Sequence, residues 1–241
     1  MKIETAFGVI DEQDINSVRI DKLIAYLVLN RRSVVSVDVL SAIIWPQGVE
    51  NPYGSLRGLV FRAKKILQPI FPDKSFITAS KGSYEINRDF DVSADTELLS
   101  VKINAVTAAK AAGGHYTATD DDLKFLDSRC FAFMESLSSD IWGLPVGTYY
   151  NSKMLSYLGS VLDSLYEQGR FDDVILYAAK GLAIDPLSEG LHEKIIKSLL
   201  SQGNRKMASD YYRNTIRAFM QEYNISPSNN FKSLRKIITN F

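Results

Sequence analysis

The sequence predicts a mainly α-helical protein with an α+β N-terminal part, residues 1–92, and an all-α part, residues 93–241. Three observations support this fold class. Helical segments are followed by two β-rich arms around Ser80-Lys81-Gly82-Ser83, which is a hairpin pattern. Strand patterns then vanish, and helical patterns continue through the rest of the sequence. Within this helical part, Gln168-Gly169 returns 34 residues later as Gln202-Gly203, which suggests a repeat.

Composition restricts the classes of protein that this chain can represent. Hydrophobic residues make up 46% of the 241 residues and charged residues 23%, which is typical of a globular protein. Because 28 Lys and Arg balance 28 Asp and Glu, a nucleic-acid site would need local clustering of positive charge. The single Cys130 excludes an internal disulfide and a Cys-rich zinc site, and it fits a reducing cytoplasm. No run of 18 apolar residues or signal-peptide core occurs, so we expect a cytoplasmic protein without membrane spans.

The N-terminal elements follow from their apolar periodicity and their end signals. Residues 2–20 alternate loosely and predict one or two short strands. A first helix over residues 20–30 places Leu23, Ile24, Leu27 and Val28 on one face. A second helix is capped by Ser36 and stopped by Pro46. A longer third helix starts near residue 52 and ends at Pro69.

This order of elements predicts a winged helix-turn-helix. Two short helices, a longer third helix and a hairpin, with arms at residues 76–79 and 84–87, follow one another. In such domains one helix enters the major groove of DNA, and the wing contacts the neighbouring backbone or minor groove. Residues 1–92 are therefore predicted to be a DNA-binding domain.

The third helix has two distinct sides at about 100° per residue. The core side is predicted to contain Leu56, Leu59, Val60, Ala63, Leu67 and Ile70. The outward side contains Gly54, Arg57, Gly58, Phe61, Lys65 and Gln68, with Lys64 at its edge. Between residues 50 and 86, six Lys and Arg face three Asp and Glu, a modest local surplus of positive charge.

Each outward residue has a role that its chemistry suits. Arg57 can donate two hydrogen bonds to a guanine edge, and Phe61 can contact a thymine methyl group. Cations such as Lys65 suit phosphate contacts, which position the helix without reading sequence. Gly54 and Gly58 leave room for DNA to approach the backbone closely. The complete set of predicted DNA-binding residues is Arg57, Gly58, Phe61, Arg62, Lys64, Lys65 and Lys81.

Simpler interpretations remain open for these residues. Lys and Arg on the outer face of a helix are commonly just solvated. Phe61 could pack beneath the wing or a neighbouring loop, since an exposed Phe on a monomer requires an explanation. Lys81 could be an ordinary turn residue. Trp45 is expected to belong to the core, or to cap the second helix, rather than to stack on a base.

The helical part has the 34-residue period of tetratricopeptide repeats. Shifted by this period, Leu158, Val161, Leu162 and Leu165 fall on His192, Ile195, Ile196 and Leu199. Gly169 and Gly203 fall at the turns between paired helices, and Pro186 ends the second helix of the first pair. Because only two copies are visible, residues 123–138 and 229–241 are candidates for capping helices. Ordinary antiparallel helices that share a period are the alternative.

Other clusters of polar residues give no sign of catalysis. His115 and His192 lie far apart in sequence without a metal-ligand pattern, and His192 is expected to pack between helices. Asp120, Asp121 and Asp122 suit the first turn of a helix capped by Thr117 or Thr119. Neither a phosphate loop nor a nucleophile motif is present, so we expect no enzyme, metal or cofactor.

Several motifs in the second half resemble the bacterial transcriptional activator domain. They include Asp185-Pro186, Glu189-Gly190-Leu191-His192, Gly203-Asn204, Tyr211-Tyr212 and the stretch NISPS at residues 224–228. The first half is similar to the OmpR-like winged helix that precedes this domain in Streptomyces antibiotic regulatory proteins. LIAYLVLNRRSVVSVDVLSAIIWP and KGSYEI carry that similarity, whereas Ala63-Lys64-Lys65 and Ser83 depart from the common pattern.

This resemblance implies a transcriptional regulator that binds double-stranded promoter DNA. Residues 93–241 would contact RNA polymerase or another protein, and two copies would bind direct repeats as a homodimer. An alternative from another class is a protein-interaction adaptor whose winged helix has lost sequence-specific DNA binding. The neutral overall charge and the glycines of the third helix favour that alternative.

Overall fold

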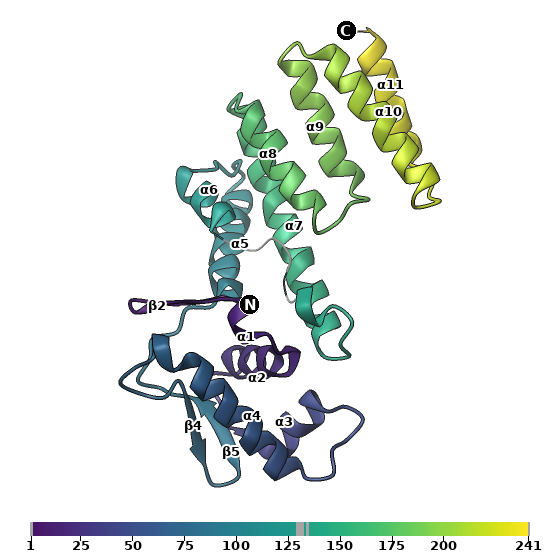
Figure 1. The fold of residues 1–241 in the computed structure, drawn as a ribbon. Helices are drawn as coiled ribbons and strands as arrows, with labels where there is room; N and C mark the ends of the chain where they lie inside the picture. Colours follow the sequence, from purple (N-terminus) through teal and green to yellow (C-terminus); the bar gives the residue numbers. More distant parts are fainter. Residues whose placement is uncertain (1, 129–132, 134, 241) are drawn as a thin grey trace. The chain divides into compact units, whose positions relative to one another are not determined.

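The computed structural model describes residues 2–128, 133 and 135–240 of the chain (Figure 1). Cys130 and part of the capping candidate at residues 123–138 lie outside the described residues. Contacts divide the chain into two compact units. The first unit comprises Met1–Ala94 and Met134–Thr148, and the second comprises Asp95–Phe133 and Tyr149–Phe241.

The first unit contains short helices and two small antiparallel sheets. One sheet has the order β1-β2, and the other has the order β3-β5-β4. In register, Ser80 pairs with Ser83 at the tip of the β4–β5 hairpin, and Val35 of β3 pairs with Tyr84. The elements are β1 (Ile3–Thr5), β2 (Gly8–Ile10), α1 (Glu12–Ile15), α2 (Val18–Leu29), β3 (Val35–Ser36), α3 (Val37–Ile44), α4 (Pro52–Leu67), η1 (Gln68–Ile70), β4 (Ile77–Ser80), β5 (Ser83–Ile86) and η2 (Glu135–Leu137).

The elements predicted for the first unit are confirmed. Two short strands lie within residues 2–20, the predicted helices follow as α2, α3 and α4, and a hairpin closes the series, whereas the four-residue helix α1 was not predicted. The hydroxyl oxygen of Ser36 accepts a hydrogen bond from the Val39 amide at 3.3 Å and caps α3. Trp45 is the C-cap residue of α3 and packs against the core, as predicted. Strand β3 could not be predicted, because two residues are too short for an alternation pattern.

A segment from further along the chain belongs to the first unit. Residues 134–148 were expected in the helical part, but their contacts join them to the winged-helix elements. Lys22 of α2 is 2% exposed, and its ammonium group lies 2.5 Å from the Asp140 carboxylate. The rings of Tyr26 and Trp142 pack at a centroid distance of 5.3 Å. A buried ion pair and an aromatic contact therefore hold this segment on α2.

The second unit consists of helices and has one contiguous apolar core. Its helices are α5 (Asp95–Ala111), α6 (Asp120–Asp127), α7 (Gly143–Glu167, from Tyr149 onward), α8 (Phe171–Leu182), α9 (Glu189–Ser201), α10 (Arg205–Gln221) and α11 (Asn229–Asn240). From α8 onward, successive helices lie side by side (Figure 1), and α11 packs against both α9 and α10. The fold class is thus mainly α, with an α+β N-terminal part followed by a tetratricopeptide-like helical part.

The 34-residue register predicts the core of this unit correctly. Leu158, Val161, Leu162 and Leu165 are 0% exposed, and their shifted counterparts Ile195, Ile196 and Leu199 are buried. Gly169 and Gly203 both have positive φ, 73° and 76°, at the turns between helices. Because a Cβ atom disfavours this conformation, glycine is the residue that these turns require. The candidate capping helix at residues 229–241 is present as α11.

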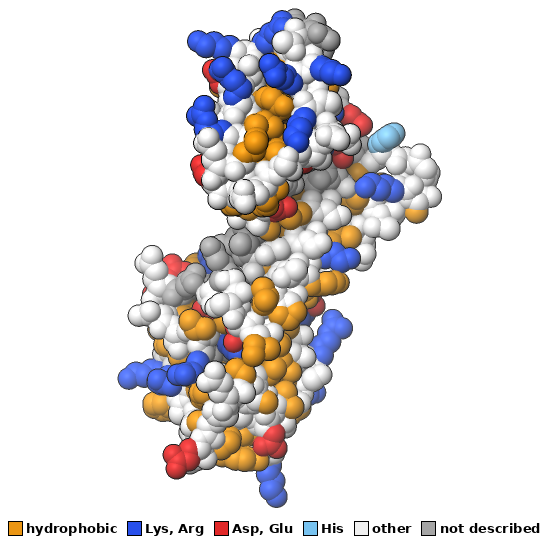
Figure 2. Space-filling model, turned by 90° about the vertical axis from the view of Figure 1, so that its right-hand side faces the viewer, with side chains coloured by type: hydrophobic (Ala, Val, Ile, Leu, Met, Phe, Trp, Pro, Cys, Tyr) orange, Lys and Arg blue, Asp and Glu red, His pale blue; other side chains and the backbone are white. Residues whose placement is uncertain are grey.

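Charge is unevenly distributed along the repeats. Residues 163–193 contain seven Asp and Glu but two Lys and Arg, whereas residues 203–240 contain two Asp and Glu but seven Lys and Arg. Figure 2 shows Lys and Arg side chains around a strip of apolar side chains at the C-terminal end of the second unit. Among the described residues, no helix has the length and apolar character needed to cross a bilayer.

Candidate nucleic-acid interface

The candidate interface is built on α4, whose sequence specifies both of its ends. The Asn51 side chain accepts a hydrogen bond from the Gly54 amide at 2.9 Å, and Pro52 occupies the first turn, where its missing N–H costs nothing. Lys64 and Lys65 lie in the last turn, where cations suit the helix dipole. The helix is thereby fixed in length and direction over 16 residues.

The predicted division of α4 into two sides is confirmed. All six residues predicted for the core side are buried, at 0–4% exposure: Leu56, Leu59, Val60, Ala63, Leu67 and Ile70. Arg57, Gly58, Arg62 and Lys65 are exposed, and Lys64 has intermediate exposure at the edge. Phe61 is 69% exposed, so it does not pack beneath the wing.

One line of exposed side chains on α4 repeats every four residues. It consists of Tyr53, Arg57, Phe61 and Lys65, and we call it the outer row. Residues four apart lie on the same side of a helix, which explains why these side chains share a face. Tyr53, which is 58% exposed, is absent from the predicted DNA-binding set. Its spacing of four from Arg57 is the signal that could have identified it.

The positive charges of this face are not neutralised by nearby acids. Within residues 2–128, no acidic group lies in ion-pair distance of Arg57, Arg62, Lys64, Lys65 or Lys81. By contrast, Lys74 pairs with Asp89 at 2.6 Å, and Arg88 pairs with Glu85 at 2.9 Å. Asp89 and Glu85 are therefore occupied by other cations, and the charge of α4 faces solvent.

The wing lies beside the first half of α4. The turn at Lys81-Gly82 uses a positive φ of 73° at Gly82, and the Gly82 carbonyl accepts a hydrogen bond from the Val37 amide at 3.0 Å. This bond fixes the wing tip against the start of α3. An open hollow separates the wing from α4, and Tyr53, Gly54, Arg57, Ser80, Gly82 and Ser83 are among its lining residues. Lys81 is exposed at the tip, as predicted.

The surroundings of the two glycines of α4 differ, and they explain only one of the two. A Cβ atom at Gly54 would lie 2.6 Å from the Asn51 side-chain nitrogen, so a larger residue would disturb the cap. A Cβ atom at Gly58 would meet no atom within 4 Å. Gly54 is therefore explained by capping rather than by the close approach of DNA. Nothing in the packing of the first unit explains Gly58.

The acidic run at residues 120–122 has a structural role in the second unit. Thr119 and Asp122 form a capping box, which confirms Thr119 as the cap. Burial opposes ionisation of Asp122, but hydrogen bonds from Lys102, Thr119, Tyr157 and Tyr116 outweigh it and lower the pKa of this carboxyl group to about 2. The charge of Asp122 is therefore already satisfied by donors of its own unit.

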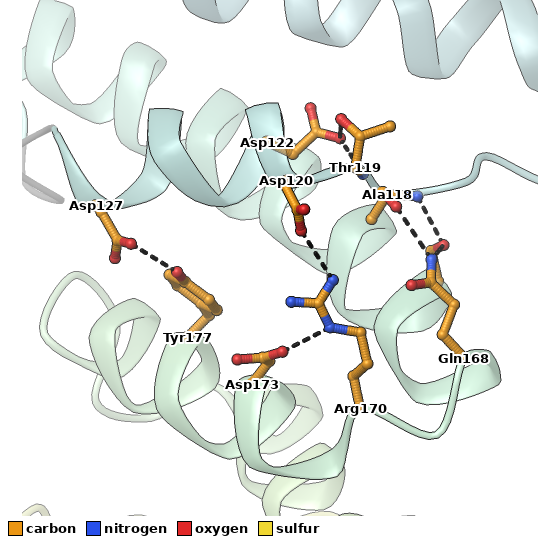
Figure 3. A network of polar contacts seen from close by, with 10 residues as sticks. Ala118, Thr119, Asp120, Asp122, Asp127, Gln168, Arg170, Asp173 and Tyr177 are labelled. Atoms are coloured by element: carbon orange, nitrogen blue, oxygen red, sulfur yellow. Dashed lines mark hydrogen bonds and ion pairs between the residues drawn. The ribbon is translucent and has the colours of Figure 1, made fainter.

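A second set of polar contacts ties α6 to α8 (Figure 3). Arg170 bonds Asp173 at 2.7 Å and Asp120 at 3.3 Å. The Tyr177 hydroxyl donates to Asp127 at 3.0 Å, and burial together with this bond raises the pKa of Tyr177 to about 12. Arg170, Asp173, Asp120, Tyr177 and Asp127 each bond another side chain of the second unit, which is typical of a structural connection between helices.

His192 fills a half-buried position between helices, as predicted. Its Nδ1 atom lies 2.8 Å from the Tyr211 hydroxyl, and its Nε2 atom lies 3.0 Å from the Pro186 carbonyl oxygen. Because a carbonyl only accepts, Nε2 carries the proton and Nδ1 accepts from Tyr211 in the neutral ring. Burial lowers the pKa of His192 despite the opposing effects of Pro186 and Asp185. Among the described residues, no group of three His, Cys, Asp or Glu could hold a metal ion.

These features define the class of the protein as a winged helix-turn-helix joined to helical repeats. The profile of the bacterial transcriptional activator domain (BTAD) matches residues 107–239, more than half of the chain. The chain therefore belongs to this family. A comparison with curated proteins gives no match.

A solved structure shares the fold across both units. It is titled "Mycobacterium tuberculosis EmbR in complex with low affinity phosphopeptide". The match has a TM-score of 0.62 and covers 97% of this chain at 18% sequence identity. This chain spans 61% of that structure's length. At this identity the likeness concerns the fold alone.

Proposed function

We propose that the chain is a DNA-binding transcriptional regulator of the Streptomyces antibiotic regulatory protein type. Its winged helix, residues 1–92, reads promoter DNA. The single observation that carries this proposal is the outer row of α4, which is exposed beside the wing and carries cations without acidic partners. If the lysines of α4 were merely solvated, the exposure of Phe61 among them would have no explanation.

Each group on this face has a defined task in a DNA complex. Arg57 donates its two parallel N–H bonds to O6 and N7 of one guanine, and Phe61 packs on a thymine methyl group. Arg62, Lys64 and Lys65 bind phosphates and set the register of the helix. Lys81 at the wing tip binds the backbone beyond the groove. Gly58 allows close approach of the DNA, which gives a reason for a glycine in open space.

The helical part, residues 93–241, supplies the protein contact of an activator. It binds RNA polymerase or another protein, and two copies occupy direct repeats as a homodimer in the cytoplasm. The family match supports this assignment, because it covers residues 107–239 of this part.

Selection of genomic DNA tests the proposal. The full chain is mixed with sheared genomic fragments at low salt, and retained fragments are sequenced. We expect a small set of fragments that share a motif, and we expect the double variant Arg57→Ala, Lys65→Ala to lose it. Lys2→Ala, directly before β1, is the control and should retain the same fragments. Retention of no specific fragment would overturn the proposal and favour the adaptor.

A further inference from the structure

A second group of unpaired cations lies on α10 and α11. Five exposed side chains there have no acidic partner within the described part of the second unit. They are Lys206, Arg217, Lys232, Arg235 and Lys236, and we call them the C-terminal basic surface. Arg213 is exposed nearby but is paired with Asp210.

Several acidic groups that precede this surface along the repeats already have partners. Asp163 pairs with Lys194, Asp173 with Arg170, and Glu193 with Lys197. The Glu189 carboxylate accepts hydrogen bonds from the Ser228 amide and hydroxyl. A second copy that docked here through these four acidic residues would have to break existing contacts.

The two helices that carry the C-terminal basic surface, α10 and α11, also have exposed apolar side chains. Met207 is 59% exposed and Met220 55% on α10, and Ile237 is 38% exposed on α11. Figure 2 shows the apolar strip at this end with Lys and Arg around it. The sulfur and methylene groups of methionine adapt to irregular apolar partners, and clusters of exposed methionine are used at protein-binding surfaces.

We propose that the C-terminal basic surface binds a protein segment that carries acidic and apolar side chains on one face. This inference rests on the proposed function, in which the helical part contacts another protein, and it assigns the surface and the chemistry of that contact. Acidic groups would pair with the cations, and apolar side chains would cover Met207, Met220 and Ile237. A DNA backbone would satisfy the cations but leave the exposed side chains of Met207, Met220 and Ile237 in water, which favours a protein partner.

A designed peptide tests the proposal. The probe is a labelled helical peptide of about 20 residues with Glu and Leu interleaved on one face. Binding to the full chain is measured by fluorescence anisotropy across a salt series. We expect saturable binding that weakens with salt, and binding weaker by about tenfold or more when Gln replaces every Glu in the peptide.

Variants of the chain locate the binding site. Lys206→Glu, Arg217→Glu and Lys236→Glu together should weaken peptide binding by about tenfold or more. The matched control carries Lys110→Glu, Lys124→Glu and Lys153→Glu, three exposed positions elsewhere in the second unit, and should bind like wild type. Met220→Ser with Ile237→Ser should also weaken binding, although the charge is unchanged. Circular dichroism confirms that each variant is folded.

Several outcomes would overturn the inference. Equal loss in the charge-reversal variant and its control would mean nonspecific attraction. Loss of genomic-fragment retention with unchanged peptide binding would assign the surface to DNA. Dissociation of a wild-type dimer by the same variant, seen in sedimentation, would assign it to a second copy. Arg57→Ala with Lys65→Ala should leave peptide binding intact, so a failure of the DNA-binding proposal is recognised separately.

Discussion

Arg57 and Lys65 occupy the same row of α4, yet their chemistry predicts different losses of DNA binding when each is replaced by alanine. Arg57→Ala removes a bidentate contact to one base pair and should weaken cognate binding by about 1–3 kcal/mol, with relaxed preference at that position. Lys65→Ala removes one phosphate contact, so all sequences should weaken about equally and the salt slope should fall by about 1. Titrations of a selected fragment and its single-base variants at several salt concentrations measure both effects. Identical losses on every sequence for both variants would contradict the assigned roles.

His192 predicts a pH dependence that belongs to the helical part. Because burial lowers its pKa below 6.5, the unfolded chain takes up a proton first as pH falls. The free energy of unfolding should therefore decrease as pH falls from 6.5 towards the lower folded pKa. Urea unfolding at pH 7.5 and 5.5 should show this decrease in wild type and in His115→Gln, but not in His192→Leu. An equal decrease in His192→Leu would refute the assignment.

At the residue scale, periodicity predicted more than residue type did. The core side of α4 and the half-buried place of His192 followed from helical spacing. The exposure of Phe61 could not be predicted in this way. An apolar residue at the edge of a helix stripe can pack or stay exposed, and only tertiary contacts decide between the two. Gly54 was misread for a similar reason, since its requirement comes from the rotamer of Asn51.

Within helix α4, the two glycines can be compared by a matched pair of substitutions to alanine. Gly58→Ala adds a Cβ in open space and should stabilise the fold by about 0.5–1 kcal/mol. Gly54→Ala should gain less or lose stability, because its Cβ displaces the capping side chain of Asn51, a contact of about 1 kcal/mol. Thermal unfolding distinguishes the two. If Gly58 serves DNA approach, Gly58→Ala should also weaken fragment binding while it raises stability; equal destabilisation by both substitutions would contradict this account.

The stability of the first unit is expected to depend strongly on one ion pair, which holds the segment that follows residue 134. Asp140→Asn leaves the buried ammonium group of Lys22 without its partner and should destabilise the first unit by about 3–5 kcal/mol. Lys22→Met with Asp140→Leu should restore much of that loss, because two apolar side chains need no partner. Asp89→Asn, which breaks the exposed pair with Lys74, is the control and should have a much smaller effect in urea unfolding. A negligible loss in Asp140→Asn would show that this pair does not hold the segment.

Element order was predictable from the sequence, but this segment was not. Helices α2 to α4 and the hairpin have strong local patterns, with caps, prolines and apolar spacing that agree. The contact of Lys22 with Asp140 joins residues far apart in the chain, and neither residue differs locally from a solvated surface charge. Only the burial of Lys22 in the folded unit identifies the pair.

For the whole molecule, the balanced net charge conceals two separate basic surfaces. The outer row of α4 with the wing is one, and the C-terminal basic surface is the other. The overall composition gives no sign of DNA binding, because acidic residues elsewhere in the chain cancel these positive charges in the total. Ion pairing in the fold separates neutralised cations from those that face solvent, and this information is absent from the sequence.

Photo-crosslinking from position 61 tests most directly whether α4 enters the groove. Phe61 is replaced by benzoylphenylalanine, and the complex with a selected fragment is irradiated. We expect a covalent adduct to bases within the shared motif, and no adduct from the same group at Leu176, an exposed position on α8. A stable complex without an adduct from position 61 would mean that the outer row does not lie against DNA.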